Sequence, residues 1–113
     1  MGYRKVSALE SAKDLEQPWT QLKLGSVENY DVKVAVYQGE YMRHVHEHHD
    51  EFIYVLSGTV YIEFEAEEVT LCPGDGIIVG KGTAHKSRCE GRAEVLLFEK
   101  DTIMDDYVKL EER

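Results

Sequence analysis

Four of the five histidines in this chain lie between positions 44 and 49. Imidazole nitrogens and carboxylate oxygens are the usual ligands of divalent transition metals in proteins. His44 and His46 are two residues apart, so on a β-strand both side chains point to the same face. Glu51 begins the next apolar run after a short polar connection, and a hairpin there would bring its carboxylate back beside the two imidazoles. This stretch therefore predicts a metal site.

The remaining histidine, His85, follows a glycine-containing turn at residues 80–84. A mononuclear metal site needs three or four converging donors and often keeps one position open for a substrate. Three nitrogens and one oxygen would come from the candidates His44, His46, Glu51 and His85. This donor set suits one divalent Fe, Mn, Co, Ni, Cu or Zn ion and excludes none of them.

An isolated pair of histidines two residues apart is more often a polar surface than a metal site. Glu51 downstream and His85 from a separate turn favour the metal here. His48 and His49 lie in the predicted connection, where alternation no longer directs a side chain inward. We expect these two to be exposed or to lie behind the ligands, not to bind the metal. No catalytic residue is assigned, because no general base is evident beyond them.

Length and charge limit the classes of function. With 113 residues, the chain is long enough for one domain with one core. Its net charge of −9 argues against binding nucleic acid or an anionic membrane surface. No apolar run reaches the length of a membrane-spanning helix, and the first residues lack the apolar core of a signal peptide. Cys72 and Cys89 have neither metal-knuckle nor redox spacing, so we expect reduced thiols in a cytoplasmic protein.

The first part of the chain is expected to be an N-terminal arm, over residues 1–19. The capping-box spacing of Ser7 and Glu10 predicts a short helix over residues 8–14 within it. Trp19 is the only tryptophan. We interpret it as an anchor for the core or for an interface, not as a platform for a ligand.

The barrel is expected to span about residues 20–100, where apolar residues recur with period two. Turns are predicted at residues 25–26 and 39–40. Strands are predicted over residues 32–37, 41–46, 52–56, 59–64, 69–71, 77–79 and 95–98. Short strands joined by close turns indicate an all-β sandwich or barrel. Residues 101–113 are charged and weakly patterned, and we expect a tail or an arm that packs on a partner chain.

These residues resemble the two motifs of the cupin family, whose members are small β-barrels. The first motif is a glycine, a pair of histidines two apart, a glutamate and a second glycine, and its positions match Gly39, His44, His46, Glu51 and Gly58. The second motif runs from a glycine through a turn to a histidine, and its positions match Gly74, residues 80–82 and His85. The resemblance covers about residues 30–100. It implies a double-stranded β-helix, or jelly-roll, barrel.

Three positions depart from the family pattern. Gly39 lies one residue nearer to His44 than the pattern asks. Gly80 replaces the usual proline before His85, and Cys89 stands where an asparagine is common. None of these departures removes a ligand, so they concern the loops around the site.

The resemblance implies a fold and metal ligation more than a reaction, because the family includes dioxygenases, isomerases, epimerases, sugar-binding regulators and storage proteins. The first motif is most similar to the mannose-6-phosphate-isomerase-like group. We expect a small metalloenzyme of the oxygenase or isomerase/epimerase type that acts on an oxygen-rich metabolite. The alternative is a noncatalytic module that binds a small sugar, organic acid or metal. A purely structural metal is the third possibility.

Two further expectations concern partners. Cupin barrels commonly pair, so the resemblance implies a homodimer, and an outer strand face carrying Phe52, Tyr54 and Leu56 would need cover. The pocket is expected to take a small oxygen-rich anion or a polyol, because a divalent cation with three imidazoles and one carboxylate keeps a charge of about +1. No glycine-rich phosphate loop precedes a helix, so a nucleotide is not expected.

Overall fold

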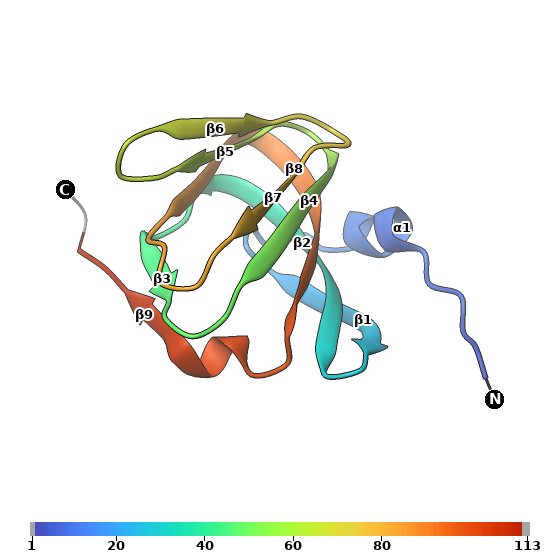
Figure 1. Cartoon of the computed structure of the whole chain (residues 1–113). Coiled ribbons are helices and arrows are strands. Elements are labelled where there is room, and N and C mark those ends of the chain that lie inside the picture. The colour runs from blue at the N-terminus through green and yellow to red at the C-terminus, as the bar shows by residue number, and fades with distance from the viewer. Residues whose placement is uncertain (1, 112–113) are drawn as a thin grey trace.

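The computed structural model describes residues 2–111, which contain one α-helix, nine strands and one 3₁₀ turn (Figure 1). The strands make up most of the structure, as the period-two pattern predicts. The elements are α1 (Ala8–Lys13), β1 (Gln21–Val27), β2 (Tyr30–Glu40), β3 (His44–His46), β4 (Glu51–Ser57), β5 (Val60–Glu63), β6 (Glu68–Leu71), β7 (Gly76–Val79), β8 (Lys86–Lys100), η1 (Ile103–Asp106) and β9 (Tyr107–Lys109).

The strands form a barrel of two antiparallel sheets, which confirms the all-β jelly-roll prediction. The larger sheet has the order β1-β2-β8-β4-β7, and β5 and β6 extend it from the other half of β8. The smaller sheet consists of β3 and β9. Because the long strand β8 pairs with β2, β4 and β5, it joins the parts of the larger sheet into one curved wall (Figure 1).

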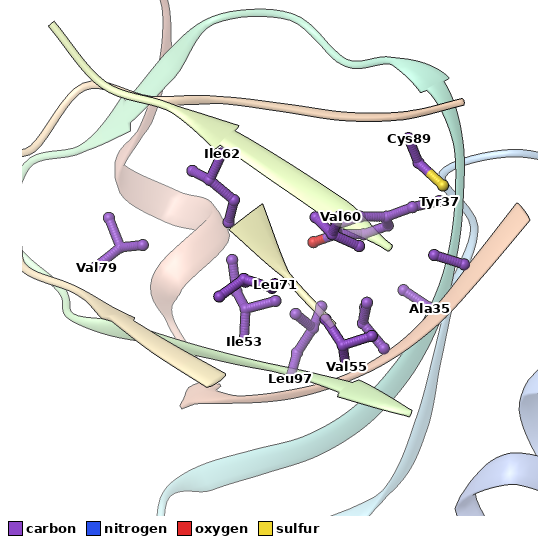
Figure 2. Packing of buried hydrophobic residues seen from close by; sticks show 12 residues of the cluster. Ala35, Tyr37, Ile53, Val55, Val60, Ile62, Leu71, Val79, Cys89 and Leu97 are labelled. Atoms are coloured by element: carbon purple, nitrogen blue, oxygen red, sulfur yellow. The ribbon is translucent and has the colours of Figure 1, made fainter. Parts of the chain in front are cut away.

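The core lies inside this barrel and follows the alternation of the strands. On β4, Glu51, Ile53 and Val55 are buried, whereas the residues between them are half-buried. Figure 2 shows side chains from β4, β5 and β8 converging on one interior, with Ile53 and Leu97 among them. The inward face of β4 thus carries two apolar core residues and, at its first position, the Glu51 carboxylate.

Several predictions about the strands were wrong. Residues 39–40, where a turn was expected, continue β2 and pair with β8, and the strand expected over residues 41–46 begins at His44. The turn expected at residues 25–26 is instead a register shift near Gly25, and β1 continues to Val27. A strand was expected only over residues 95–98, but β8 begins at Lys86. Its first half was missed because polar residues hide the alternation, although Ser87 and Cys89 point inward and are buried.

The N-terminal arm contains the predicted helix, α1, which begins after Ser7. The side chain of Ser7 makes no capping hydrogen bond. The helix is held at its other end, where the Arg92 guanidinium donates hydrogen bonds to the carbonyl oxygens of Ala12 and Leu15. The helix therefore docks on β8 through its C-terminus rather than through a capping box.

A tail or an arm on a partner was expected for residues 101–113, but residues 101–111 pack on the barrel of the same chain; residues 112–113 lie outside the described residues. Ile103 in η1 is fully buried, and β9 pairs with β3 of the same chain. In this pairing His44 lies opposite Lys109, and His46 lies opposite Tyr107. The chain end is therefore part of the wall that carries two of the candidate ligands, and Figure 1 shows β9 beside β3.

Candidate metal centre

Three of the four candidate ligands come together at the mouth of the barrel. His44 and His85 face each other across a pair of backbone hydrogen bonds, with N···O distances of 3.0 and 2.9 Å. Glu51 opens β4, and its Oε1 atom lies 3.5 Å from Nε2 of His85. One donor atom from each of these three residues lies within 4.8 Å of the others, and all three side chains are buried.

His46 lies beside this group of three donors. Its ring centroid is 5.2 Å from that of His44, at an interplanar angle of 85°. It is buried and lines the same cavity, but it is not among the residues whose donor atoms approach within 4.8 Å of one another. The structure therefore brings together His44, Glu51 and His85 and leaves His46 at their edge.

All three histidines turn the same nitrogen away from the cavity. The Nδ1–H group of His44 donates to the carbonyl oxygen of Met42, and that of His85 donates to the carbonyl oxygen of Thr83, both at 3.0 Å. The Nδ1 atom of His46 lies 3.2 Å from the Ile103 carbonyl oxygen. Because carbonyl oxygens only accept hydrogen bonds, Nδ1 carries a proton in each ring, which leaves Nε2 as the nitrogen that can bind a metal.

His48 and His49 lie in the connection between β3 and β4, as predicted. His48 is exposed, and its backbone N–H donates to Asp106. The Nδ1 atom of His49 lies 2.7 Å from Oδ2 of Asp106, the same oxygen that accepts the hydrogen bond from His48. The Nε2 atom of His49 lies 3.0 Å from the Thr102 hydroxyl. Neither ring belongs to the cluster of donor atoms.

A family model described as "Cupin domain" matches residues 32–99, which is more than half of the chain. The chain belongs to the cupin family. It is 32% identical over 92 residues to the uncharacterized protein YdbB of Bacillus subtilis (strain 168), and the match covers 80% of this cupin and 81% of YdbB. The resemblance inferred from the two motifs is thereby confirmed.

Solved structures show the same fold. A cupin-2 domain containing protein from Shewanella frigidimarina NCIMB 400 superposes with a TM-score of 0.81 at 24% identity, over 84% of this cupin and 93% of that chain. Hydroquinone 1,2-dioxygenase from Sphingomonas sp. TTNP3, with 4-hydroxybenzoate bound, superposes with a TM-score of 0.72 at 16% identity, over 83% and 72%. At these identities the two likenesses establish the fold alone. No helix within residues 2–111 is long and apolar enough to cross a membrane.

The charge states of the donors suit a metal ion. Burial, together with the neighbouring His85, lowers the pKa of His44 to about 4, so this ring is neutral at pH 7. Burial raises the pKa of Glu51, but its contacts with His85 and Glu99 outweigh that effect and leave the pKa below its ordinary value. Nε2 of His85 lies 3.5 Å from the ionised carboxylate oxygen of Glu51. Buried imidazole nitrogens and a carboxylate oxygen are donors that suit a divalent metal, which would displace any proton held between Nε2 and the carboxylate.

Glu99 is a site residue that the sequence analysis missed. It is fully buried on β8 opposite Glu51, and Lys33 Nζ lies 2.9 Å from its Oε1 atom. Burial and the charge of Glu51 raise the pKa of Glu99 to about 7. The signal was present in the alternation, because Val95, Leu97 and Glu99 occupy one face of the strand. The motif comparison did not use it.

Aromatic side chains enclose the cavity in front of the donors. Trp19 lies with its ring 4.5 Å from that of Tyr37 and 5.0 Å from that of Tyr41. The space is small, about 50 Å³, and Met104 and Tyr107 from the chain end also line it. Trp19 packs on the core as predicted, but it also forms a wall of the pocket, which the sequence analysis did not expect.

Proposed function

We propose that this cupin is a small metal-dependent enzyme that binds one divalent transition metal through His44, His46, Glu51 and His85. Its reaction is of the oxygenase or the isomerase/epimerase type and acts on a small, oxygen-rich metabolite. The observation that carries the proposal is a buried group of His44, His85 and the ionised Glu51 carboxylate that lines an aromatic cavity. His46 is included because it lines that cavity with Nε2 unpaired by its own hydrogen bonds.

When bound, such a metal supplies a Lewis acid or an oxygen-binding centre. The chain itself contributes shape and proton placement. The hydroxyl oxygens of Tyr41 and Tyr107 lie 3.4 Å apart, and the Tyr107 ring stacks on the His44 ring. The two hydroxyl groups can therefore hydrogen-bond to a ligand next to the metal donors. Glu99, whose pKa is raised to about 7, lies opposite Glu51 and is a buried group that can take up or release a proton there. Trp19 and Tyr37 add aromatic surface to the wall, which would limit the water around the reacting atoms.

The lining also selects the class of ligand. Among the described residues around this cavity, none is a lysine or an arginine. A phosphorylated sugar therefore has no cationic partner among these lining residues, although the first motif resembles that of the mannose-6-phosphate-isomerase-like group. A small carboxylate, an enediol or a vicinal diol can supply oxygen donors to a centre with a charge of about +1. We propose a ligand of that class.

The alternative function is a noncatalytic module that binds the same class of ligand. The small cavity favours it, because about 50 Å³ is far less than the roughly 300 Å³ at which pockets for drug-sized ligands begin. Turnover by the metal-loaded protein, followed both as oxygen consumption and as conversion of the substrate seen by NMR, separates the two functions when it is screened across small organic acids, diols and sugars. Turnover of any of them supports the enzyme, whereas metal-dependent binding without turnover supports the module.

The metal itself is tested first. Elemental analysis of the purified protein is expected to find one divalent metal per chain, and His46→Ala is expected to lower that content sharply. Retention of the parent content by His46→Ala would remove His46 from the ligand set. A parent protein that neither contains a divalent metal nor binds one when it is added would contradict the proposal as a whole.

We further propose that the cupin forms a homodimer through the outer face of the larger sheet. On that face Phe52 lies between Phe98 and Ile78 in neighbouring strands, and Ile78 is 73% exposed. An apolar surface of this kind needs cover. Light scattering is expected to give twice the mass of one chain, and Ile78→Lys is expected to reduce it to the mass of one chain.

The predicted cytoplasmic location rests only on the thiols of Cys72 and Cys89, which are unpaired.

A further inference from the structure

The third histidine, His46, is oriented from the end of the chain. Its Nδ1 atom lies 3.2 Å from Oδ1 of Asp106, in addition to the Ile103 carbonyl oxygen. The other oxygen of the same carboxylate, Oδ2, lies 2.7 Å from Nδ1 of His49 and accepts a hydrogen bond from the backbone N–H of His48 at 2.7 Å. The Asp106 carboxylate therefore contacts the His46 ring, the His48 backbone N–H and the His49 ring, all within the stretch that carries the first motif.

The segment around Asp106 has other attachments to the barrel. The Ile103 side chain is fully buried, and β9 pairs with β3. The Tyr107 ring stacks on the His44 ring, with centroids 4.9 Å apart and an interplanar angle of 26°. Because these contacts already hold residues 103–109 on the barrel, the carboxylate of Asp106 is not needed to anchor the segment. Its side chain is only 9% exposed and faces the two imidazoles.

We propose that Asp106 is a positioning residue of the metal centre. By accepting the hydrogen bond from Nδ1–H of His46, it fixes the orientation of that ring and leaves Nε2 for the metal. This inference rests on the proposed metal-binding function. It adds to the centre a residue that lies outside both cupin motifs and outside the matched region, residues 32–99.

The physical basis is the effect of a carboxylate on a ligating imidazole. Such a partner sets the tautomer, restricts the rotation of the ring and raises the basicity of the other nitrogen, and its loss typically costs about 10- to 100-fold in metal affinity. The coupling is reciprocal. A metal that binds the oriented ring stabilises, by the same factor, the arrangement in which Asp106 contacts His46. Metal binding and the order of residues 103–109 are therefore linked.

The direct test is the Zn²⁺ affinity of the full chain, measured by competition with a chromophoric chelator. Asp106→Asn is nearly isosteric but cannot accept hydrogen bonds through both side-chain atoms, so we expect its affinity to fall about 10- to 100-fold. Asp101→Asn removes the same charge from an exposed position five residues earlier and is the matched control, with an unchanged affinity expected. Equal affinities for Asp106→Asn and the parent would overturn the inference.

A double-mutant cycle separates positioning from a general structural role. If Asp106 acts through His46, Asp106→Asn costs no further affinity in the His46→Ala background. If Asp106 only supports the fold of the site, the same loss appears in both backgrounds, and the inference is overturned. A parent chain that binds no Zn²⁺ would overturn both this inference and the proposed function, whereas normal binding by the parent and by Asp106→Asn would overturn this inference alone.

A second measurement needs no change at Asp106, in case that variant does not fold. Hydrogen exchange of the amides of residues 106–109 is compared with and without saturating Zn²⁺. In the parent we expect Zn²⁺ to slow this exchange, because metal and segment are linked through His46. In His46→Ala we expect saturating Zn²⁺ to leave it unchanged. Identical exchange with and without Zn²⁺ in the parent would overturn the inference.

Discussion

The two halves of the candidate metal centre are held in different ways. His44 and His85 face each other through a backbone bridge, and each donates to a carbonyl oxygen two residues earlier in its own chain segment. His46 donates instead to Ile103 and Asp106, 57 and 60 residues away. We call the first the local half and the second the remote half.

This difference decides how each half can fail. Side-chain substitutions cannot remove the carbonyl oxygens that orient the local half, so only replacing a ligand itself disables it. The remote half depends on side chains and on a chain end that packs through two short elements, η1 and β9. It can therefore be weakened without touching any ligand. The following predictions, from the largest effect to the smallest, test this contrast.

Replacing a ligand of the local half should have the largest effect. His85→Ala removes a donor and leaves the Glu51 carboxylate without its imidazole partner. We expect the Zn²⁺ affinity to fall by more than about 1000-fold, beyond the 10- to 100-fold typical of a residue that only orients a ligand. Competition titration measures it. A residue that only orients a ligand costs at least about 10-fold in affinity when it is lost. If the affinity of His85→Ala stays within about tenfold of the parent value, His85 is therefore not a ligand.

The remote half should be sensitive to its buried anchor. Ile103→Ala deletes a fully buried side chain, so we expect the free energy of unfolding to fall by about 2–5 kcal/mol. Met104→Ala is the matched control, because Met104 is 51% exposed and its loss should cost within about 0.5 kcal/mol. Urea denaturation of the metal-free proteins measures both. If the two variants are equally stable, the segment is not anchored as described.

His44 in the local half and the buried Glu99, which lies opposite Glu51, predict a pH dependence of stability. The pKa of His44 is lowered to about 4, so His44 makes the folded state more stable as the pH rises from about 4 to its unfolded value of 6.5. The pKa of Glu99 is raised to about 7, so Glu99 has the opposite effect from 4.5 to 7. The two effects oppose each other between pH 4.5 and 6.5.

Removing one of these groups should reveal the other. In metal-free Glu99→Gln we expect the free energy of unfolding to rise with pH over that window, by up to about 1.4 kcal/mol per pH unit, the limit for one proton. The parent should change much less. Denaturant titrations at several pH values measure the slopes. Parallel curves for the parent and Glu99→Gln would show that Glu99 does not oppose His44.

The smallest effect should come from the hydroxyl of Tyr107, which links the chain end to the local half. Tyr107→Phe keeps the ring stacked on His44 and loses only the long contact with the Tyr41 hydroxyl. We expect a cost below about 1 kcal/mol in stability and an almost unchanged Zn²⁺ affinity. Tyr107→Ala also loses the stacked ring and should cost more in both. Equal losses in the two variants would show that the ring contributes nothing.

The sequence was informative where the structure is local. Alternation predicted that His44 and His46 share one face of a strand, the predicted hairpin brought Glu51 beside them, and the two motifs together predicted His85 and the barrel. Alternation could not reveal the first half of β8, where the inward positions are taken by small polar residues such as Ser87. It assigned Trp19 to the core without placing it at the pocket, because that contact depends on how the arm enters the barrel.

The chain end was missed for a related reason. Residues 101–113 have no period-two pattern, and β9 is only three residues long. Its pairing with β3 and the contact between Asp106 and His46 join residues about 60 positions apart, and a single sequence carries no signal for such a contact. Glu99 is intermediate, because extending the alternation of Val95 and Leu97 by one step would have placed it inside the barrel.

The most direct test of the account is the position of a metal in Zn²⁺-loaded crystals, located by anomalous scattering. We predict one ion per chain, bound by Nε2 of three histidines and by a carboxylate oxygen at roughly 2.0–2.2 Å. The four ligands are predicted to be His44, His46, Glu51 and His85. An ion bound without His46, or bound instead by His48 or His49, would contradict the account.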